Sequence, residues 1–257
     1  MRIALGIEYD GTAYNGWQRQ RVGNGVQEHL EKALSQVADE AVEVVCAGRT
    51  DTGVHATGQV VHFDASNERT ARSWLLGANT NMPDDIAVTW AKPVSDDFHA
   101  RFSALSRSYR YVILNCLVRS ALNRHRAWWV YQPLDADRMQ MAAQAIGGKH
   151  DFSAFRAAGC QASTATREIS SISVVREGDK IYVDVTANAF LQHMVRNITG
   201  TLVAVGCGEL PVESMAAILA SRDRKEGGVA APPHGLTLVS VAYPDEFQLP
   251  KKVNMPV

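Results

Sequence analysis

The segment Gly48–Ala56 reads G-R-T-D-T-G-V-H-A and presents a single carboxylate, that of Asp51. In an extended chain, side chains two positions apart project to the same side, so the guanidinium of Arg49 is expected beside this carboxylate. A neighbouring arginine favours the ionised form of an aspartate. Such an aspartate suits a nucleophile or an electrostatic stabiliser better than a proton shuttle. The alternative interpretation is an ordinary polar turn with a surface ion pair of little energetic value.

Hydrophobic periodicity predicts the elements that position this segment. A short apolar strand over 42–47 leads into it, and Asn24 with Gln27 forms a capping box that predicts the start of a helix. The first hundred residues therefore predict the order β-α-β-β-α-β. The expected strands cover about 2–8, 42–47, 57–64 and 86–92, and the expected helices begin at 24 and near 70.

The rest of the chain predicts a similar order of elements. Asp135 is the expected N-cap of a helix that ends at Gly147 and Gly148. The other expected elements are strands at 107–115, 127–131, 167–176, 180–187 and 236–243, a long helix at 190–206 and a shorter one from Pro211. This predicts an α+β fold of two similar halves with mostly antiparallel sheets and helices packed on them. The expected domains are 1–105, which carries Asp51, and 106–257.

Composition excludes several classes of protein. The chain has 257 residues, 46% of them hydrophobic and 21% charged, with a formal net charge of -1. It contains no apolar run of 18 residues, and its start resembles a strand instead of a signal peptide, so we expect a cytoplasmic protein without a membrane partner. The four widely spaced cysteines predict reduced thiols. No metal-ligand spacing occurs, and Gly147-Gly148-Lys149 lacks the rest of a P-loop, so neither a metal nor a nucleotide cofactor is expected.

The distribution of charge points to RNA although the net charge does not. Residues 98–134 contain no Asp or Glu, but they contain six arginines interleaved with tyrosines and tryptophans. Arginines for phosphates beside aromatic rings for bases are typical of RNA-binding surfaces. A second acid-free stretch, 11–27, carries Arg19 and Arg21. A solvated strand and a polar loop are the alternative interpretation of these two stretches.

The predicted long helix has an apolar stripe and a polar side that includes Arg196. Gly200 follows Arg196 by one turn, so another segment is expected to pack closely there. An amphipathic helix with a solvated arginine is the alternative.

Asp51-Thr52-Gly53 is also the tripeptide of aspartic proteases, but these enzymes use two such aspartates that share a proton, and this chain has only one D-T-G.

Five sequence motifs, in order along nearly the whole chain, resemble the tRNA pseudouridine synthase A (TruA) family. The longest is A-G-R-T-D-T-G-V-H-A-T-G-Q-V at 47–60. The others are E-Y-D-G-T-A-Y-N-G-W-Q-R-Q at 8–20, R-S-Y-R-Y at 107–111, H-D-F-S-A-F-R at 150–156 and N-A-F-L-Q-H-M-V-R-N-I-T-G at 188–200, and Gly235-Leu236 also fits.

The resemblance implies an isomerase that converts uridine to pseudouridine at positions 38 to 40 of the tRNA anticodon stem-loop, without a cofactor. It implies that Asp51 is the nucleophile, that Tyr109 stacks on the target base and helps to remove its C5 proton, and that Arg196 pairs with the carboxylate. Leu236 would pack on the base in an active-site cleft between the two halves.

The resemblance also implies how the RNA is held. Arg49 would occupy the space left by the flipped uridine, and so would no longer be the main partner of Asp51. Arg19, Arg21, Arg107 and Arg110 would bind phosphates, and a homodimer would hold the tRNA across both subunits. A non-catalytic RNA-binding protein is the alternative function, and an aspartic hydrolase is a weaker one.

Overall fold

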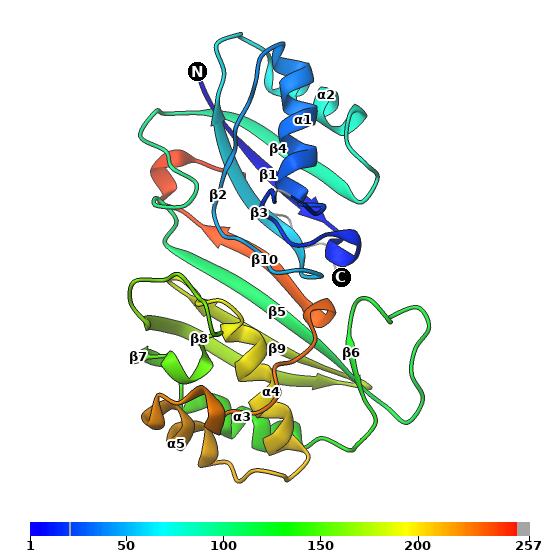
Figure 1. The fold of residues 1–257 in the computed structure, drawn as a ribbon, viewed down its shortest axis with the longest axis vertical. Coiled ribbons are helices and arrows are strands. Elements are labelled where there is room, and N and C mark those ends of the chain that lie inside the picture. Colours follow the sequence, from blue (N-terminus) through cyan, green and yellow to red (C-terminus); the bar gives the residue numbers. More distant parts are fainter. Residues whose placement is uncertain (21, 251–257) are drawn as a thin grey trace. The chain divides into compact units, whose positions relative to one another are not determined.

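The computed structural model describes residues 1–20 and 22–250 and has an α+β fold (Figure 1). The chain forms two compact units. The first consists of Met1–Arg107 together with the described residues from Leu238 onward, and the second is Ser108–Thr237. The described residues also include short 3-10 helices at Gly11–Ala13, Ser153–Phe155, Arg224–Glu226, Pro233–Gly235 and Asp245–Phe247.

The first unit has the expected order of strands and helices. Its elements are β1 (Arg2–Tyr9), α1 (Val26–Ala38), β2 (Val45–Cys46), β3 (His55–Asp64), α2 (Ala71–Thr80) and β4 (Ile86–Val94). β1 is antiparallel to both of its neighbours, and Leu5 lies opposite Val61 of β3 and Ala91 of β4. Alternation along β1 directs Ile3, Leu5 and Ile7 into the core. The helices complete this core, where the ring of Trp74 meets Phe63 edge-on.

The second unit consists of β5 (Ser106–Asn115), β6 (Trp128–Val130), α3 (Ala136–Gln144), β7 (Gly148–Asp151), β8 (Thr166–Glu177), β9 (Lys180–Ala187), α4 (Met194–Gly206) and α5 (Ser214–Ser221), with β5 beginning at the boundary between the units. The strand order is β5-β9-β8-β7, and β6 pairs in parallel with β5. α3 packs against β8 and α4. The carboxylate of Asp135 accepts hydrogen bonds from the amides of Asp137 and Arg138, which confirms the expected N-cap of α3.

Three local predictions differ from the structure. The N-cap of α1 is Gly25, so the capping box is wrong; the Asn24 side chain contacts His29, and Gln27 bonds Glu31. α4 begins at Met194 instead of 190, because His193 before it has a left-handed backbone with a φ of 61°. The third helix ends at Gln144 instead of at Gly147 and Gly148, and Gly148 begins β7, where it pairs with Ile169.

The C-terminal strand β10 (Leu236–Ala242) passes from the second unit to the first, whereas the sequence placed all of 106–257 in one domain. The contacts after Thr237 explain this difference. β10 lies next to β3 in the strand order, and Leu238 is fully buried. The Tyr243 hydroxyl donates to the Ala100 carbonyl at 2.6 Å. Among the described residues, no helix is both long and apolar enough to cross a membrane.

Candidate active site

Asp51 lies in the turn between β2 and β3, in the first unit. Its side chain is half-buried, and its carbonyl accepts a hydrogen bond from the Val54 amide at 3.1 Å. Gly53 has a φ of 77°, a conformation that glycine adopts without strain. The segment is therefore a defined tight turn that leads directly into the buried strand β3.

The segment Tyr9–Trp17 holds this turn from one side. The Trp17 amide donates to the Thr50 carbonyl at 3.0 Å, and the Tyr9 hydroxyl lies 2.8 Å from the Thr50 hydroxyl. Gly16 has a φ of 93°, and a Cβ there would lie 2.6 Å from the Thr50 carbonyl oxygen. Only glycine permits so close an approach, so the G in the motif N-G-W is explained by contact with the residue before Asp51.

Two buried side chains hold the residues that precede the turn. Arg107, which is 9% exposed, donates from Nη2 and Nε to the Ala47 carbonyl at 2.9 and 3.3 Å. Gln59, which is fully buried, donates from Nε2 to the Gly48 carbonyl at 2.6 Å. Consecutive carbonyls before Asp51 thus have side-chain partners in the interior of the first unit.

Arg49 does not form the ion pair that sequence adjacency predicts. Its side chain is exposed and makes no hydrogen bond or ion pair with another described residue. The exposed guanidinium is therefore accessible to a ligand at the surface of the turn.

Arg196 lies in the first turn of α4, in the second unit, and is tied to the loop that precedes β10. Its Nε donates to the Ala231 carbonyl at 2.7 Å, and its own carbonyl accepts from the Ala231 amide at 3.0 Å. A Cβ on Gly200 would lie 1.7 Å from the Val229 carbonyl oxygen. The predicted close packing at Gly200 is therefore confirmed. The loop that approaches Gly200 also supplies the Ala231 carbonyl, which holds the side chain of Arg196.

Tyr109 and Leu236 also belong to the second unit. Tyr109 on β5 is 8% exposed, and its ring packs edge-on against Phe190 with centroids 5.1 Å apart. Phe190 lies in the segment before α4 that the sequence assigned to the helix. Leu236, the first residue of β10, is 5% exposed. Nearby, the Tyr111 hydroxyl donates to the Pro232 carbonyl at 2.7 Å, which anchors the same loop.

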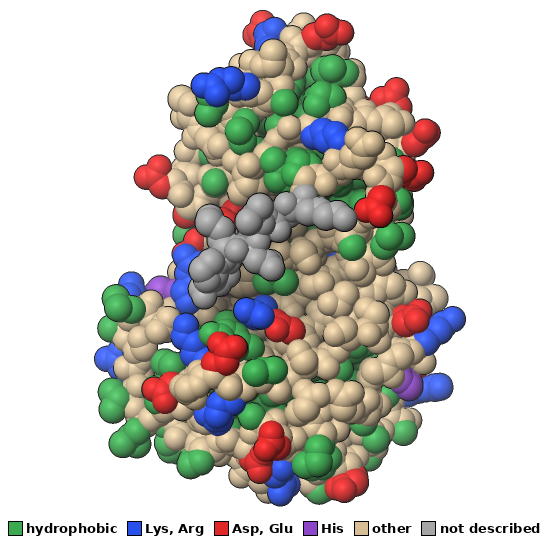
Figure 2. Space-filling view, turned by 180° about the vertical axis from the view of Figure 1, so that it is seen from behind, with side chains coloured by type: hydrophobic (Ala, Val, Ile, Leu, Met, Phe, Trp, Pro, Cys, Tyr) green, Lys and Arg blue, Asp and Glu red, His purple; other side chains and the backbone are tan. Residues whose placement is uncertain are grey.

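The four arginines expected to bind phosphates differ in their surroundings. Arg19 is exposed, with its guanidinium 3.6 Å from the Glu31 carboxylate, and Arg21 lies outside the described residues. Arg110 forms a two-pronged pair with Asp184 at 2.8 Å, and this hydrogen bond raises the pKa of Arg110. Arg107 is buried, which speaks against a phosphate contact. Figure 2 shows cationic and anionic side chains interspersed over one face.

Two buried amides beside the candidate residues were not singled out from the sequence. Gln59 contacts the Gly48 carbonyl, and Asn197, which is 2% exposed, donates to the Phe155 carbonyl at 2.8 Å. Arg224 in turn donates to Asn197 at 3.0 Å. The sequence signal that could have indicated them is an amide side chain within an otherwise apolar strand or helix face. Such a side chain is usually buried only where it has hydrogen-bond partners, so its presence there predicts a structural contact.

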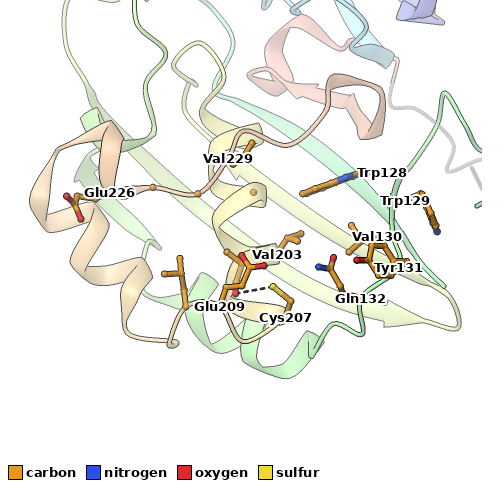
Figure 3. Close-up of a pocket in the computed structure, with 15 residues that line it drawn as sticks. Trp128, Trp129, Val130, Tyr131, Gln132, Val203, Cys207, Glu209, Glu226 and Val229 are labelled. Atoms are coloured by element: carbon orange, nitrogen blue, oxygen red, sulfur yellow. Dashed lines mark hydrogen bonds between the residues drawn. The ribbon is translucent and has the colours of Figure 1, made fainter. Parts of the chain in front are cut away.

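A cavity of about 750 Å³ lies in the second unit, lined by none of the candidate residues (Figure 3). β6 supplies Trp128 and Trp129 on one side of it, and Glu209 and Glu226 lie on the other. Within residues 1–20 and 22–250, no group of three His, Cys, Asp or Glu side chains is arranged to hold a metal ion.

Comparison with known proteins identifies similar sequences over nearly the full length. A family profile described as tRNA pseudouridine synthase matches residues 6–103 and 142–244. The chain is 57% identical to tRNA pseudouridine synthase A of Pseudoalteromonas atlantica, over 98% of this chain and 95% of the relative. It is 56% and 53% identical to the proteins of the same name from Shewanella amazonensis and Hydrogenovibrio crunogenus, over 98% of this chain and 96% of each relative.

Proposed function

Because the chain belongs to the tRNA pseudouridine synthase A family, and is therefore an isomerase that modifies tRNA, we propose that Asp51 is its catalytic nucleophile. We further propose that it acts on uridines 38 to 40 of the anticodon stem-loop. The observation that carries the proposal is a half-buried carboxylate on a turn held by Tyr9, Trp17, Gln59 and Arg107. Such preorganisation is what a nucleophile requires.

The reaction is a rearrangement within one nucleotide. The bond from the ribose C1′ to uracil N1 breaks, the uracil turns over, and a bond forms from C1′ to C5. C5 loses its proton and N1 gains one, so the product is an isomer of the substrate. Asp51 attacks either the uracil ring or C1′, and both routes need an ionised carboxylate and no external oxidant or reductant.

The remaining catalytic roles fall to residues of the second unit. Arg196 pairs with the carboxylate of Asp51, and its bond to the Ala231 carbonyl supports this by restricting the guanidinium. Tyr109 stacks on the target base and helps to remove the C5 proton, and the apolar Leu236 packs on the same base.

Base flipping costs a few kcal/mol, less in a loop than in a duplex. Stacking on an aromatic ring such as Tyr109 can return about 1 to 3 kcal/mol per base. The exposed Arg49 would occupy the space that the flipped uridine leaves. Exposed arginines such as Arg19 would bind phosphates, and this binding would weaken as salt concentration rises.

We also propose that the protein acts as a homodimer in the cytoplasm and holds its tRNA across both subunits. The near-zero net charge of the chain supports this arrangement, because two subunits can build a basic surface that one cannot. The four free cysteines fit a reducing compartment. Light scattering of the purified protein, with and without tRNA, tests the oligomeric state.

The decisive experiment measures tritium release from unmodified tRNA that carries tritium at uridine C5. We expect the wild type to release tritium and the Asp51→Asn variant to release none, while its tRNA affinity stays close to that of the wild type. The matched control is Asp84→Asn, an exposed aspartate of the same unit, which should behave as the wild type does. Full activity of Asp51→Asn would contradict the proposal.

A further inference from the structure

We propose that Arg107 is a positioning residue for the turn of Asp51, and that it does not contact RNA. This inference rests on the proposed role of Asp51. For an arginine in the basic stretch 98–134, the sequence predicts a phosphate contact, and the inference replaces that contact with a structural role. Geometry, burial and the chemistry of the guanidinium group support it.

The guanidinium of Arg107 is surrounded by backbone carbonyls of the first unit. Besides its two bonds to Ala47, Nη2 donates to the Arg101 carbonyl at 2.7 Å and Nη1 donates to the Ala104 carbonyl at 3.2 Å. Each of its three nitrogens is thus committed to at least one carbonyl. The residue is 9% exposed, so little of its surface remains for a phosphate.

An arginine suits this position and a lysine does not. Burying a cation is costly unless its donors have partners, and a guanidinium has five N–H groups in a fixed planar fork. That fork reaches carbonyls on opposite sides of the group. An ammonium is a compact point charge, and it cannot span three carbonyls from different residues with the same geometry.

A hydrogen bond to the Ala47 carbonyl constrains the start of the segment that leads to Asp51. β2 ends at Cys46, and Ala47 is the first residue of the segment that leads to Asp51. The Ala47 amide donates to the Val60 carbonyl at 2.8 Å, and Arg107 donates to the Ala47 carbonyl, so both backbone polar groups of this residue have partners. Gln59 does the same for the next carbonyl, that of Gly48. Together they fix the path of the chain three and four residues before the carboxylate.

The expected consequence is catalytic. A displacement of a reacting group by about 1 Å can lower the rate about 100-fold even when the change lies outside the reacting atoms. Loss of the Arg107 fork would shift the segment Ala47–Asp51 while the phosphate-binding surface stays as it is. The rate for bound tRNA should therefore fall, and the affinity for tRNA should not.

The test compares Arg107→Lys with Arg101→Gln, which removes an exposed cation nearby without altering the carbonyl that Arg107 uses. Tritium release is measured in a single turnover at saturating tRNA, and tRNA affinity is measured over a series of salt concentrations. Arg107→Lys should lose about 100-fold in rate, with affinity and salt dependence unchanged. Arg101→Gln should keep its rate at saturation.

A phosphate contact gives the opposite pattern and would overturn the inference. Arg107→Gln would then bind tRNA more weakly, its salt slope would fall by about 1, and its rate at saturation would match the wild type.

Two further variants separate positioning from loss of folding. Gln59→Met should reduce the same rate. The double variant with Arg107→Lys should lose less rate than the product of the two single losses, because both residues hold the same segment. Added guanidinium should restore part of the rate of Arg107→Ala, and a rate that stays at the level without guanidinium would count against the inference.

The outcome for Asp51 is separable from this one. If wild-type protein releases no tritium from tRNA, the proposed function fails. If the wild type and Asp51→Asn behave as expected but Arg107→Lys retains the wild-type rate, only the positioning role fails.

Discussion

At the scale of single residues, the phenol of Tyr109 offers a way to separate stacking from proton transfer. Its ring packs edge-on against Phe190, a contact between two rings that phenylalanine at position 109 can also make. We expect Tyr109→Phe to bind tRNA normally but to release tritium from C5 more slowly, because a proton acceptor is lost while the ring remains. Phe190→Leu should instead weaken ring placement and binding. Wild-type tritium release by Tyr109→Phe would show that the phenol does not accept the proton.

His62 links one buried side chain to acid stability. Burial, with smaller contributions from His99 and Arg2, lowers the pKa of His62 from 6.5 to about 4, and its Nδ1 accepts a hydrogen bond from the Ala100 amide at 3.1 Å. The unfolded chain therefore takes up a proton near pH 6.5 that the folded chain takes up only near pH 4. As the pH falls from 6.5 to about 4, the contribution of neutral His62 to the free energy of unfolding is therefore lost progressively, by about 3 kcal/mol at most.

The variant His62→Asn tests this pH dependence, because the amide oxygen can replace Nδ1 as an acceptor and does not titrate. We expect a flatter dependence of the free energy of unfolding on pH between 6.5 and 4, measured by urea denaturation. His125→Asn, at an exposed histidine, is the control and should keep the wild-type slope. An unchanged slope in His62→Asn would place the acid sensitivity on other groups.

At the scale of elements, Gly200 determines how closely the loop before β10 approaches α4. Gly200→Ala should push the Val229 carbonyl away and loosen the contact of Arg196 with Ala231. We expect a loss of about 1 to 3 kcal/mol in stability, as for other overpacked sites, and a larger fractional loss of tritium release. Gly147→Ala is the control, because its Cβ would meet only the Gln144 carbonyl at 3.5 Å. Thermal melting and turnover of both variants provide the comparison.

The same elements show how far the sequence predicts the fold. Alternating and helical periodicity located β1, α2, β8 and β9 within a few residues, because these elements are defined by one buried face. Periodicity could not locate the start of α4, where the left-handed residue His193 and the contact of Phe190 with Tyr109 depend on tertiary structure. Nor could it show that Arg107 is buried, because one of the carbonyls that receive its hydrogen bonds, that of Ala47, is distant in sequence.

At the scale of the whole molecule, charge balance limits how tRNA can be bound. The chain has 26 basic and 27 acidic residues, so an arginine in a close two-pronged pair with a carboxylate contributes less to phosphate binding than an exposed one does. Arg110 is neutralised by Asp184. We expect Asp184→Asn to strengthen tRNA binding and to steepen its dependence on salt, because one more cation becomes accessible to phosphate. Arg110→Gln should change the salt dependence little. Filter binding from low to moderate salt measures both variants, and weaker binding by Asp184→Asn would contradict this expectation.

The passage of β10 into the first unit has a consequence for synthesis on the ribosome. The first 107 residues emerge early, but the strand that completes their sheet beside β3 emerges only after the whole of Ser108–Thr237. The second unit can therefore close while the nascent first unit still has an unpaired strand edge and lacks Leu238 and Tyr243. Unpaired edges invite pairing with other chains. The nascent chain is thus most prone to aggregation in the interval before β10 is translated, and a slow codon in that interval would prolong the exposure.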